Sequence, residues 1–399
     1  MRRSGGCLPG NSQMRLALIR QRYNPFGGAE RFIERAIAAL ERGGTEVTMI
    51  TRAWDAVATR RAILVDPPHV GRLWRDVSFS NGVCEALKRE HFDLVQSHER
   101  IAGCDIYRAG DGVHRQWLEN RSASASWPAR LGMWLSPYHR YICAAERLMF
   151  ENASLRAVIC NSEMVAAEIR RHFEIAAEKI HVIYNGVDLD YFHPAKRDAM
   201  RTAARSEFRC ESGDTVFSFV GSGFARKGLG LLIDAMALTG RKDFRLVVAG
   251  RDRAASQFEA RAARAGLSGR VIFAGGLEDV RPVYAASDCF ILPTRYDPFP
   301  NAALEALAMG IPAIVSSRCG AAEIVDRGRN GWVCSPEEAV PLAALMVEAA
   351  GTSGNAMGME ARRTAEGYGI ERMAERMIAL YAMLIGNLAG ATRLDHSPQ

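Results

Sequence analysis

The sequence lacks both long hydrophobic runs and paired cysteines. No uninterrupted apolar run approaches the ~18–20 residues that a membrane span requires. No apolar stretch of ~7–15 residues follows Arg2 and Arg3, so we expect neither a membrane-spanning helix nor a secretory signal peptide. The nine cysteines are an odd number, and none belongs to a CxxC pair. This pattern excludes a disulfide framework and a structural zinc site, and we expect the chain to stay in the cytosol.

A strong excess of charge is also missing. The chain has 51 basic and 45 acidic residues, which gives a formal net charge of +6. Such a mild excess suits an anionic ligand or an acidic membrane surface and does not by itself indicate nucleic acid. Hydrophobic residues make up 48% of the 399 residues, which is typical of a chain that buries a core. At roughly 100–200 residues per domain, this length predicts two domains.

The chain does contain two series of short apolar segments that alternate with helical ones. In the first half we expect strands at 16–19, 45–51, 92–96 and 156–160. In the second half we expect a five-strand set at 215–220, 244–250, 271–273, 289–292 and 313–315. Near-continuous apolar strands between helices predict α/β domains with parallel sheets covered on both faces. We place the boundary near Ile180–Pro194, which divides the chain into residues 14–183 and 184–371.

The segment Pro293–Val315 carries two carboxylates. Asp297 lies on a loop after a strand, and Glu305 lies one to two turns inside the following helix. Unpaired backbone N–H groups at the helix start, around Asn301 and Ala302, suit an anion or a hydroxyl-rich ligand. A carboxylate such as Glu305 can accept from the two vicinal hydroxyls of a ribose, and Asp297 could do the same for a hexose. The alternative is a turn aspartate followed by a solvated helix glutamate.

A glycine-rich turn at Val220–Gly228 lies between a strand and a helix. Gly223 lets the backbone approach a phosphate closely, and Arg226 and Lys227 can neutralise a diphosphate leaving group. The turn is not a Walker loop, because the GxxxxGK[ST] pattern does not occur. The alternative is an ordinary strand-to-helix turn with two exposed bases.

Two turns in the first half of the chain carry further candidates. Gly27 and Gly28 follow the first strand and open a helix whose N-terminus would face the ligand. Another strand is expected to end at Asp111, which stands between two glycines and is followed by His114. Both turns are also compatible with purely structural roles.

Tryptophan is concentrated in one basic segment. Residues 115–147 hold three of the six tryptophans, and five arginines stand there against two glutamates. Aromatic anchors beside arginines suit an anionic membrane interface or an acceptor surface. Single-stranded nucleic acid and a packed helix pair are the alternatives. The candidates for an acceptor or membrane surface are His114, Trp117, Arg121, Trp127, Arg130 and Trp134.

The segment from Asp297 to Glu305 resembles the E-x7-E signature of glycosyltransferase family 4, whose members are retaining enzymes of the GT-B fold. This chain has Asp297 where the family usually has Glu, and Pro300 where it usually has Gly. The resemblance starts at about Met14 and implies two Rossmann-like domains whose parallel sheets face each other across a cleft. It also implies that a C-terminal helix at about 372–388 packs back on the first domain.

The resemblance also assigns roles to residues. In the family the first acidic residue contacts the donor sugar and the second binds the ribose. An Asp stands at the place of Asp111 in the lipopolysaccharide-core glucosyltransferase branch, where it would hold the donor sugar or orient the acceptor hydroxyl. His114 is the alternative for this role. The matching donor-binding positions are Gly27, Gly28, Gly223, Arg226, Lys227, Leu277, Asp297, Asn301, Ala302 and Glu305. The positions with an implied catalytic role are Asp111, Arg226, Lys227 and Asp297.

The implied reaction moves a hexose, which we expect to be glucose, from a UDP-sugar to a hydroxyl of a lipopolysaccharide-core or related glycan, with retention. Because Arg226 and Lys227 can stabilise the departing diphosphate, neither a metal ion nor another cofactor is expected. The expected partners are the UDP-sugar, a lipid-linked glycan and the cytoplasmic face of the inner membrane, bound peripherally, and not nucleic acid. The alternative is a catalytically silent GT-B protein that binds a glycan or a nucleotide sugar.

Overall fold

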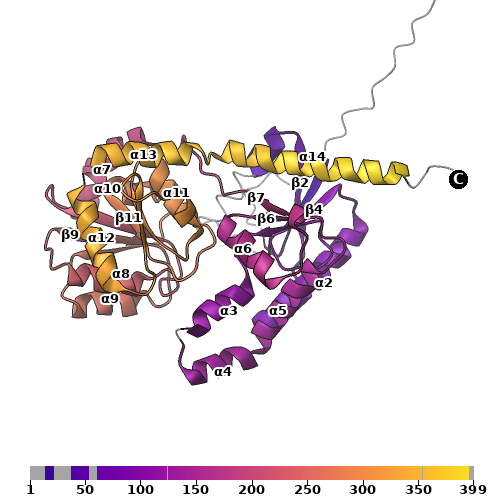
Figure 1. The fold of residues 1–399 in the computed structure, drawn as a ribbon, viewed down its shortest axis with the longest axis horizontal. Helices are drawn as coiled ribbons and strands as arrows, with labels where there is room; N and C mark the ends of the chain where they lie inside the picture. The colour runs from indigo at the N-terminus through magenta and orange to yellow at the C-terminus, as the bar shows by residue number, and fades with distance from the viewer. Residues whose placement is uncertain (1–13, 22–36, 54–60, 124, 353, 395–399) are drawn as a thin grey trace, which may run out of the picture.

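The computed structural model describes residues 14–21, 37–53, 61–123, 125–352 and 354–394. Within them the chain forms two parallel β-sheets with helices on their faces (Figure 1). The sheet of the first half lies to the right in Figure 1, and the sheet of the second half lies to the left. This arrangement confirms the predicted α/β architecture with two parallel sheets.

The first sheet has seven parallel strands in the order β3-β2-β1-β4-β5-β6-β7. Its centre is apolar on both faces: Leu16, Val47 and Leu94 are paired and buried on one face, and the paired Ile19 and Ile50 are buried on the other. The strands are β1 (Met14–Ile19), β2 (Thr45–Thr51), β3 (Ala62–Leu64), β4 (Leu94–Ser97), β5 (Ile106–Ala109), β6 (Ala157–Cys160) and β7 (Ile180–Val182). The associated helices are α2 (Gly71–Arg89), α3 (His114–Ala123), α4 (Trp127–Leu135), α5 (Pro137–Phe150), α6 (Glu163–His172) and η1 (Ala177–Lys179).

The second sheet has six parallel strands in the order β10-β9-β8-β11-β12-β13. They are β8 (Thr215–Val220), β9 (Phe244–Ala249), β10 (Val271–Gly275), β11 (Cys289–Leu292), β12 (Ala313–Ser316) and β13 (Gly331–Cys334). The helices around it are α7 (Pro194–Glu207), α8 (Leu229–Leu238), α9 (Ala255–Arg264), α10 (Arg281–Ala286), α11 (Asn301–Ala308), η2 (Gly320–Ile324), α12 (Ala339–Gly351) and α13 (Gly354–Glu366).

The prediction of five strands in the second half is therefore wrong, because it misses the sixth strand, β13. This strand begins at Gly331, whose hypothetical Cβ would lie 2.0 Å from the carbonyl oxygen of Ala313, so a glycine is required for the pairing with β12. The buried Trp332 is followed by the exposed Val333. Glycine, short length and mixed exposure together remove the continuous apolar signal that revealed the other strands.

The long C-terminal helix α14 (Ile370–Leu394) leaves the second sheet and lies over the first (Figure 1). Its apolar face, with Met373, Met377 and Leu384, belongs to the same hydrophobic cluster as Leu16 and Leu94 of the first sheet. Between α14 and β4, the Tyr381 hydroxyl donates to Oε1 of Gln96 at 2.7 Å. No helix in the described part of the chain is both long enough and apolar enough to cross a bilayer.

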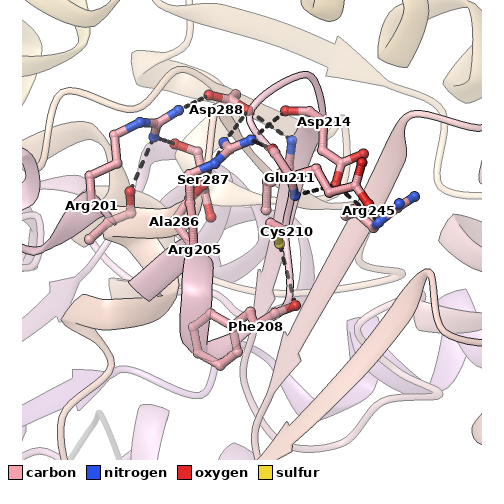
Figure 2. A network of polar contacts seen from close by, with 12 residues as sticks. Arg201, Arg205, Phe208, Cys210, Glu211, Asp214, Arg245, Ala286, Ser287 and Asp288 are labelled. Carbon is pink, nitrogen blue, oxygen red and sulfur yellow. Dashed lines mark hydrogen bonds and ion pairs between the residues drawn. The ribbon is translucent and has the colours of Figure 1, made fainter. Parts of the chain in front are cut away.

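An arginine network ties α7 to the start of β11 (Figure 2). Arg201 and Arg205 of α7 both form ion pairs with Asp288, the residue before β11. Arg201 also donates to the carbonyl oxygen of Ser287 at 3.0 Å, just beyond the last turn of α10. The carboxylate of Asp288 in turn accepts from the backbone N–H of Val216 in β8 at 2.8 Å. The network fixes the amino end of the strand whose carboxyl end carries the candidate site.

Candidate functional site

The carboxyl ends of the two sheets meet around the loop that follows β11. The loop residue Asp297 donates its backbone N–H to Arg318 O at 3.1 Å, and its carbonyl accepts from Gly320 N at 3.0 Å, after β12. From the first sheet, Val113 beyond β5 donates its backbone N–H to the hydroxyl of Tyr296 at 3.1 Å. This is the edge at which open α/β sheets bind their ligands.

The carboxylate of Asp297 contacts both cations of the glycine-rich turn. Its Oδ2 lies 3.1 Å from Nζ of Lys227 and 3.3 Å from a terminal nitrogen of Arg226. Asp297 and Lys227 are 7% and 9% exposed. Burial alone would raise the pKa of Asp297, but the charges of Lys227 and Arg226 outweigh it and hold that pKa below its ordinary value. The structure thus brings together three of the four residues for which a catalytic role was expected.

Glycines shape the turn around these cations. A Cβ at Gly221 would lie 2.7 Å from Cε of Lys227, and one at Gly228 would lie 2.1 Å from the carbonyl oxygen of Pro293. Gly223 has a φ of +78°, a left-handed conformation that favours glycine. The absence of a side chain at Gly221 therefore leaves room for the Lys227 side chain to extend along the backbone of the turn to Asp297.

Glu305 lies on α11 and is held by a buried tyrosine. The Tyr284 hydroxyl donates to Oε2 of Glu305 at 2.9 Å and lies 3.2 Å from the carbonyl oxygen of Ala302. Tyr284 is fully buried, and Glu305 is half-buried. The interpretation of Glu305 as a freely solvated helix residue is therefore wrong. The hydroxyl of the buried Tyr284 fixes the orientation of the Glu305 carboxylate.

Asn301 and Leu277 complete the expected donor side. The Asn301 side-chain oxygen accepts from Asn185 at 2.8 Å, and Asn185 also donates to the carbonyl oxygen of Phe299 at 3.1 Å. Leu277, in the loop after β10, is half-buried against the core of the second sheet. Gly27 and Gly28 lie outside the described residues. The described residues contain no cluster of three or more His, Cys, Asp or Glu side chains suited to a metal ion.

Asp111 is exposed on a tightly braced turn after β5. Arg100 donates to the carbonyl oxygen of Gly112 at 3.2 Å and to Glu146 at 2.8 Å. Asn161, beyond β6, donates to the carbonyl oxygen of Gly110 at 3.2 Å. The turn therefore presents the Asp111 carboxylate to solvent from a backbone that Arg100, after β4, and Asn161, after β6, hold in place.

His114 starts α3 and is packed rather than free. Its backbone N–H donates to Oε1 of Glu146 at 2.7 Å, its Nε2 lies 3.1 Å from Nδ1 of His139, and its ring stacks on Trp117 at 5.4 Å. Burial lowers the pKa of His114 to about 3, and the charge of Arg100 adds to this effect. The imidazole is therefore neutral near pH 7. Arg121 covers Trp117 from 5.1 Å.

Helix α4 carries the remaining aromatic candidates and lies away from both sheets, at the bottom of Figure 1. Trp127 and Trp134 are each 74% exposed, Arg130 lies between them, and α4 has no buried residue. Leu131 and Leu135 add exposed apolar surface. The six expected acceptor or membrane residues therefore separate into a packed group around His114 and Trp117 and an exposed group on α4.

Several residues that organise the site were not found from the sequence. Tyr296, directly before Asp297, donates to Oε2 of Glu168 at 2.6 Å. Glu323 in η2 accepts from the backbone N–H groups of Glu163 and Met164 at 2.9 and 2.7 Å, at the start of α6. These partners lie more than a hundred residues apart, so no local spacing could have linked them. The one sequence signal that could have pointed to Tyr296 is its position directly before Asp297.

Two family models match this chain over most of its length. "Glycosyltransferase Family 4" covers residues 26–191, and "Glycosyl transferases group 1" covers residues 214–351. The chain is 24% identical over 326 residues to the lipopolysaccharide glucosyltransferase WaaG of Escherichia coli K12, covering 80% of this chain and 85% of that protein. It is 26% identical over 392 residues to the D-inositol 3-phosphate glycosyltransferase of Jonesia denitrificans, covering 89% and 91%.

Solved structures agree on the architecture. The crystal structure of WaaG superposes with a TM-score of 0.80 at 23% identity, covering 92% of this chain and 99% of that one. The Anabaena protein Alr3699/HepE, solved in complex with UDP-glucose, gives a TM-score of 0.72 at 20% identity over 93% and 100%. Both matches extend over both sheets. The chain is therefore a glycosyltransferase with the GT-B fold, in which a Glycosyltransferase Family 4 domain is followed by a Glycosyl transferases group 1 domain.

Proposed function

We propose that the protein transfers a hexose, glucose in the first instance, from a UDP-sugar to a hydroxyl of a lipopolysaccharide-core or related glycan, with retention and without a metal ion. The observation that carries this proposal is the contact of the buried Lys227 and the exposed Arg226 with Asp297 at the carboxyl end of the second sheet. The names of the WaaG and HepE relatives support the acceptor class and the UDP-sugar.

In this proposal residues 184–371 bind the donor and residues 14–183 bind the acceptor. Lys227 and Arg226 stabilise negative charge on the departing diphosphate, the role that a divalent ion would otherwise fill. Asp297 contacts the hexose, and Glu305 accepts hydrogen bonds from the ribose. The bond between the anomeric carbon and the diphosphate oxygen breaks while the acceptor oxygen attacks from the same face, and the leaving phosphate takes the acceptor proton. No protein nucleophile is needed.

Asp111 is assigned to the other side of the reaction. It is exposed and lies on the turn whose next residues touch Tyr296, the neighbour of Asp297. From there its carboxylate can orient the acceptor hydroxyl or hold a hydroxyl of the donor sugar. The acceptor is proposed to be lipid-linked, which places the enzyme at the cytoplasmic face of the inner membrane through α4.

A screen of UDP- and GDP-sugars for thermal stabilisation tests the donor assignment, because a ligand that binds the folded state raises the melting temperature. We expect UDP-sugars to raise it and Glu305→Ala to abolish the rise. Stabilisation by GDP-sugars alone would contradict the choice of UDP. Binding without transfer, and without slow hydrolysis of the donor, would instead support a silent binding protein. The anomeric configuration of a transferred sugar, read by NMR, decides between retention and inversion.

A further inference from the structure

Tyr296 joins the two turns that are assigned to the reaction. It directly precedes Asp297, and the two side chains contact different halves of the chain. Asp297 faces Lys227 in its own domain, whereas the Tyr296 hydroxyl enters the first domain. There the hydroxyl accepts from Val113 N at 3.1 Å and donates to Oε2 of Glu168 at 2.6 Å. Tyr296 is 3% exposed.

The close approach is built into both turns. Gly112, next to Asp111, has a φ of +69°, and a Cβ there would lie 2.1 Å from the Tyr296 hydroxyl and 2.9 Å from Cγ of Pro298. Any side chain at this position would push the two turns apart. The hydroxyl therefore contacts the backbone one and two residues beyond Asp111, at a distance that glycine alone permits.

The other braces of the Asp111 turn come from the first domain itself. Arg100 holds the carbonyl of Gly112 and Asn161 holds that of Gly110, as described above. These contacts fix the turn within its own sheet, but they do not relate it to Asp297. The hydrogen bonds of Tyr296 relate the Asp111 turn to Asp297, because Tyr296 and Asp297 are adjacent in the chain.

We propose that Tyr296 is a positioning residue that sets the distance between the Asp111 turn and the sugar held at Asp297, with Glu168 anchoring its hydroxyl. The inference rests on the proposed function and deepens it. The reacting groups come from different domains, so their alignment depends on contacts that cross between the domains. A displacement of about 1 Å in such a site can cost on the order of 100-fold in rate.

Tyr296→Phe is the test, because it removes the hydroxyl and keeps the buried ring. With UDP-glucose, or whichever UDP-sugar stabilises the wild type most, we expect kcat to fall roughly 10- to 100-fold. We expect KM for the donor to stay within about twofold, and the thermal shift with UDP to stay unchanged, because the contacts proposed to hold the nucleotide are untouched. Glu168→Gln, which keeps an acceptor for the hydroxyl, should retain near-normal kcat, whereas Glu168→Ala should lower it.

Tyr184→Phe is the matched control. The Tyr184 hydroxyl, in the connection between the domains, donates to Oε2 of Glu323 at 2.8 Å. It therefore makes the same kind of tyrosine–glutamate contact beside the domain junction, since Glu323 also accepts from the start of α6 in the first half. The Tyr184 ring packs on Phe299 at 5.4 Å, a contact that phenylalanine keeps, and the hydroxyl touches neither the Asp111 turn nor Asp297. Tyr184→Phe should leave kcat unchanged even if the melting temperature falls.

The outcomes separate the two proposals. If wild type turns over the donor and Tyr296→Phe does so equally fast, the positioning role is wrong and the proposed function stands. If Tyr296→Phe and Tyr184→Phe lower kcat alike, Tyr296 contributes to the general adhesion of the domains and the positioning role is again wrong. If wild type neither transfers nor hydrolyses any UDP-sugar, the proposed function fails and the inference falls with it.

Discussion

The Nζ atom of Lys227 lies 3.1 Å from Oδ2 of Asp297, and Arg226 reaches the same oxygen at 3.3 Å. Two cations against one carboxylate leave an excess of one positive charge, which the buried Lys227 and the exposed Arg226 share. Such an excess favours a further anion, which can approach from the side of the exposed Arg226. The group expected to touch the sugar is therefore in contact with the groups expected to touch the diphosphate.

Lys227→Met should remove donor binding as well as catalysis. The change keeps the length of the side chain but removes one of the two cations, and losing a preorganised electrostatic contact costs roughly 100- to 1,000-fold in kcat. We expect the thermal shift with UDP to disappear. The variant should also lose roughly 1–3 kcal/mol of unfolding free energy, because Asp297 stays buried with one partner fewer.

Lys242→Met is the control for this prediction, since Lys242 is exposed in the same domain. It should change neither UDP binding nor turnover. A Lys227→Met protein that is stabilised by UDP as strongly as wild type would show that the diphosphate binds elsewhere.

Tyr284→Phe should weaken nucleotide binding while the fold stays intact. The change removes the hydroxyl that orients Glu305 and leaves the fully buried ring in place. Loss of one such hydrogen bond predicts roughly two- to tenfold weaker UDP binding by calorimetry. Tyr381→Phe is the matched control, because that tyrosine is equally buried and its hydroxyl contacts Gln96 in the first domain. If Tyr284→Phe and wild type bound UDP with equal affinity, the claim that Tyr284 positions Glu305 for nucleotide binding would be wrong.

The strands of this fold were predictable where burial is complete. β11 is a continuous apolar segment and β8 is interrupted only by Ser218 after its first residue, and a strand covered on both faces needs no other signal. The strand β3 has two of its three residues exposed, so its sequence Ala62–Leu64 carries no such mark. A strand of this kind is defined by its pairing with β2, which depends on distant residues.

The candidate site divides in the same way. Asp297 and Glu305 could be predicted because they lie on one strand–loop–helix segment with a recognisable spacing. The residues that hold them in place could not be predicted, because Tyr284 contacts Glu305 from another helix and Glu168 contacts Tyr296 from the other domain. A hydrogen bond between residues 128 positions apart is a property of the packed domains and leaves no trace in the local pattern.

The melting temperature should depend on pH through Glu168. Burial raises the pKa of this carboxyl to about 7, although its hydrogen bond with Tyr296 and the charge of Arg171 pull it down and Glu119 pushes it up. Because the folded-state pKa lies above the ordinary value of 4.5, the contribution of Glu168 to the unfolding free energy is full below pH 4.5. It is lost as the pH rises through about 7.

Glu168→Gln removes the titrating carboxyl, so the difference between wild type and this variant isolates its contribution to stability. The melting temperature of wild type minus that of the variant should fall steadily between pH 5 and pH 8, measured in one buffer series of constant ionic strength. A difference that does not change with pH would mean that Glu168 titrates at its ordinary value in the folded protein.

The last prediction concerns α4, where Trp127, Trp134 and their leucine neighbours are exposed beside Arg130. If this helix docks on an anionic bilayer, Trp127→Ala with Trp134→Ala should reduce sedimentation with vesicles that contain anionic lipid. Arg130→Glu should reduce it by roughly fivefold or more at low salt and have little effect with neutral vesicles, since one basic side chain contributes about 1 kcal/mol near such a surface. Val340→Ala with Met359→Ala is the control, because these side chains are 70% and 69% exposed in the other domain. Equal losses in both double variants would mean that binding follows general exposed apolar area, and the assignment of α4 as the docking helix would be wrong.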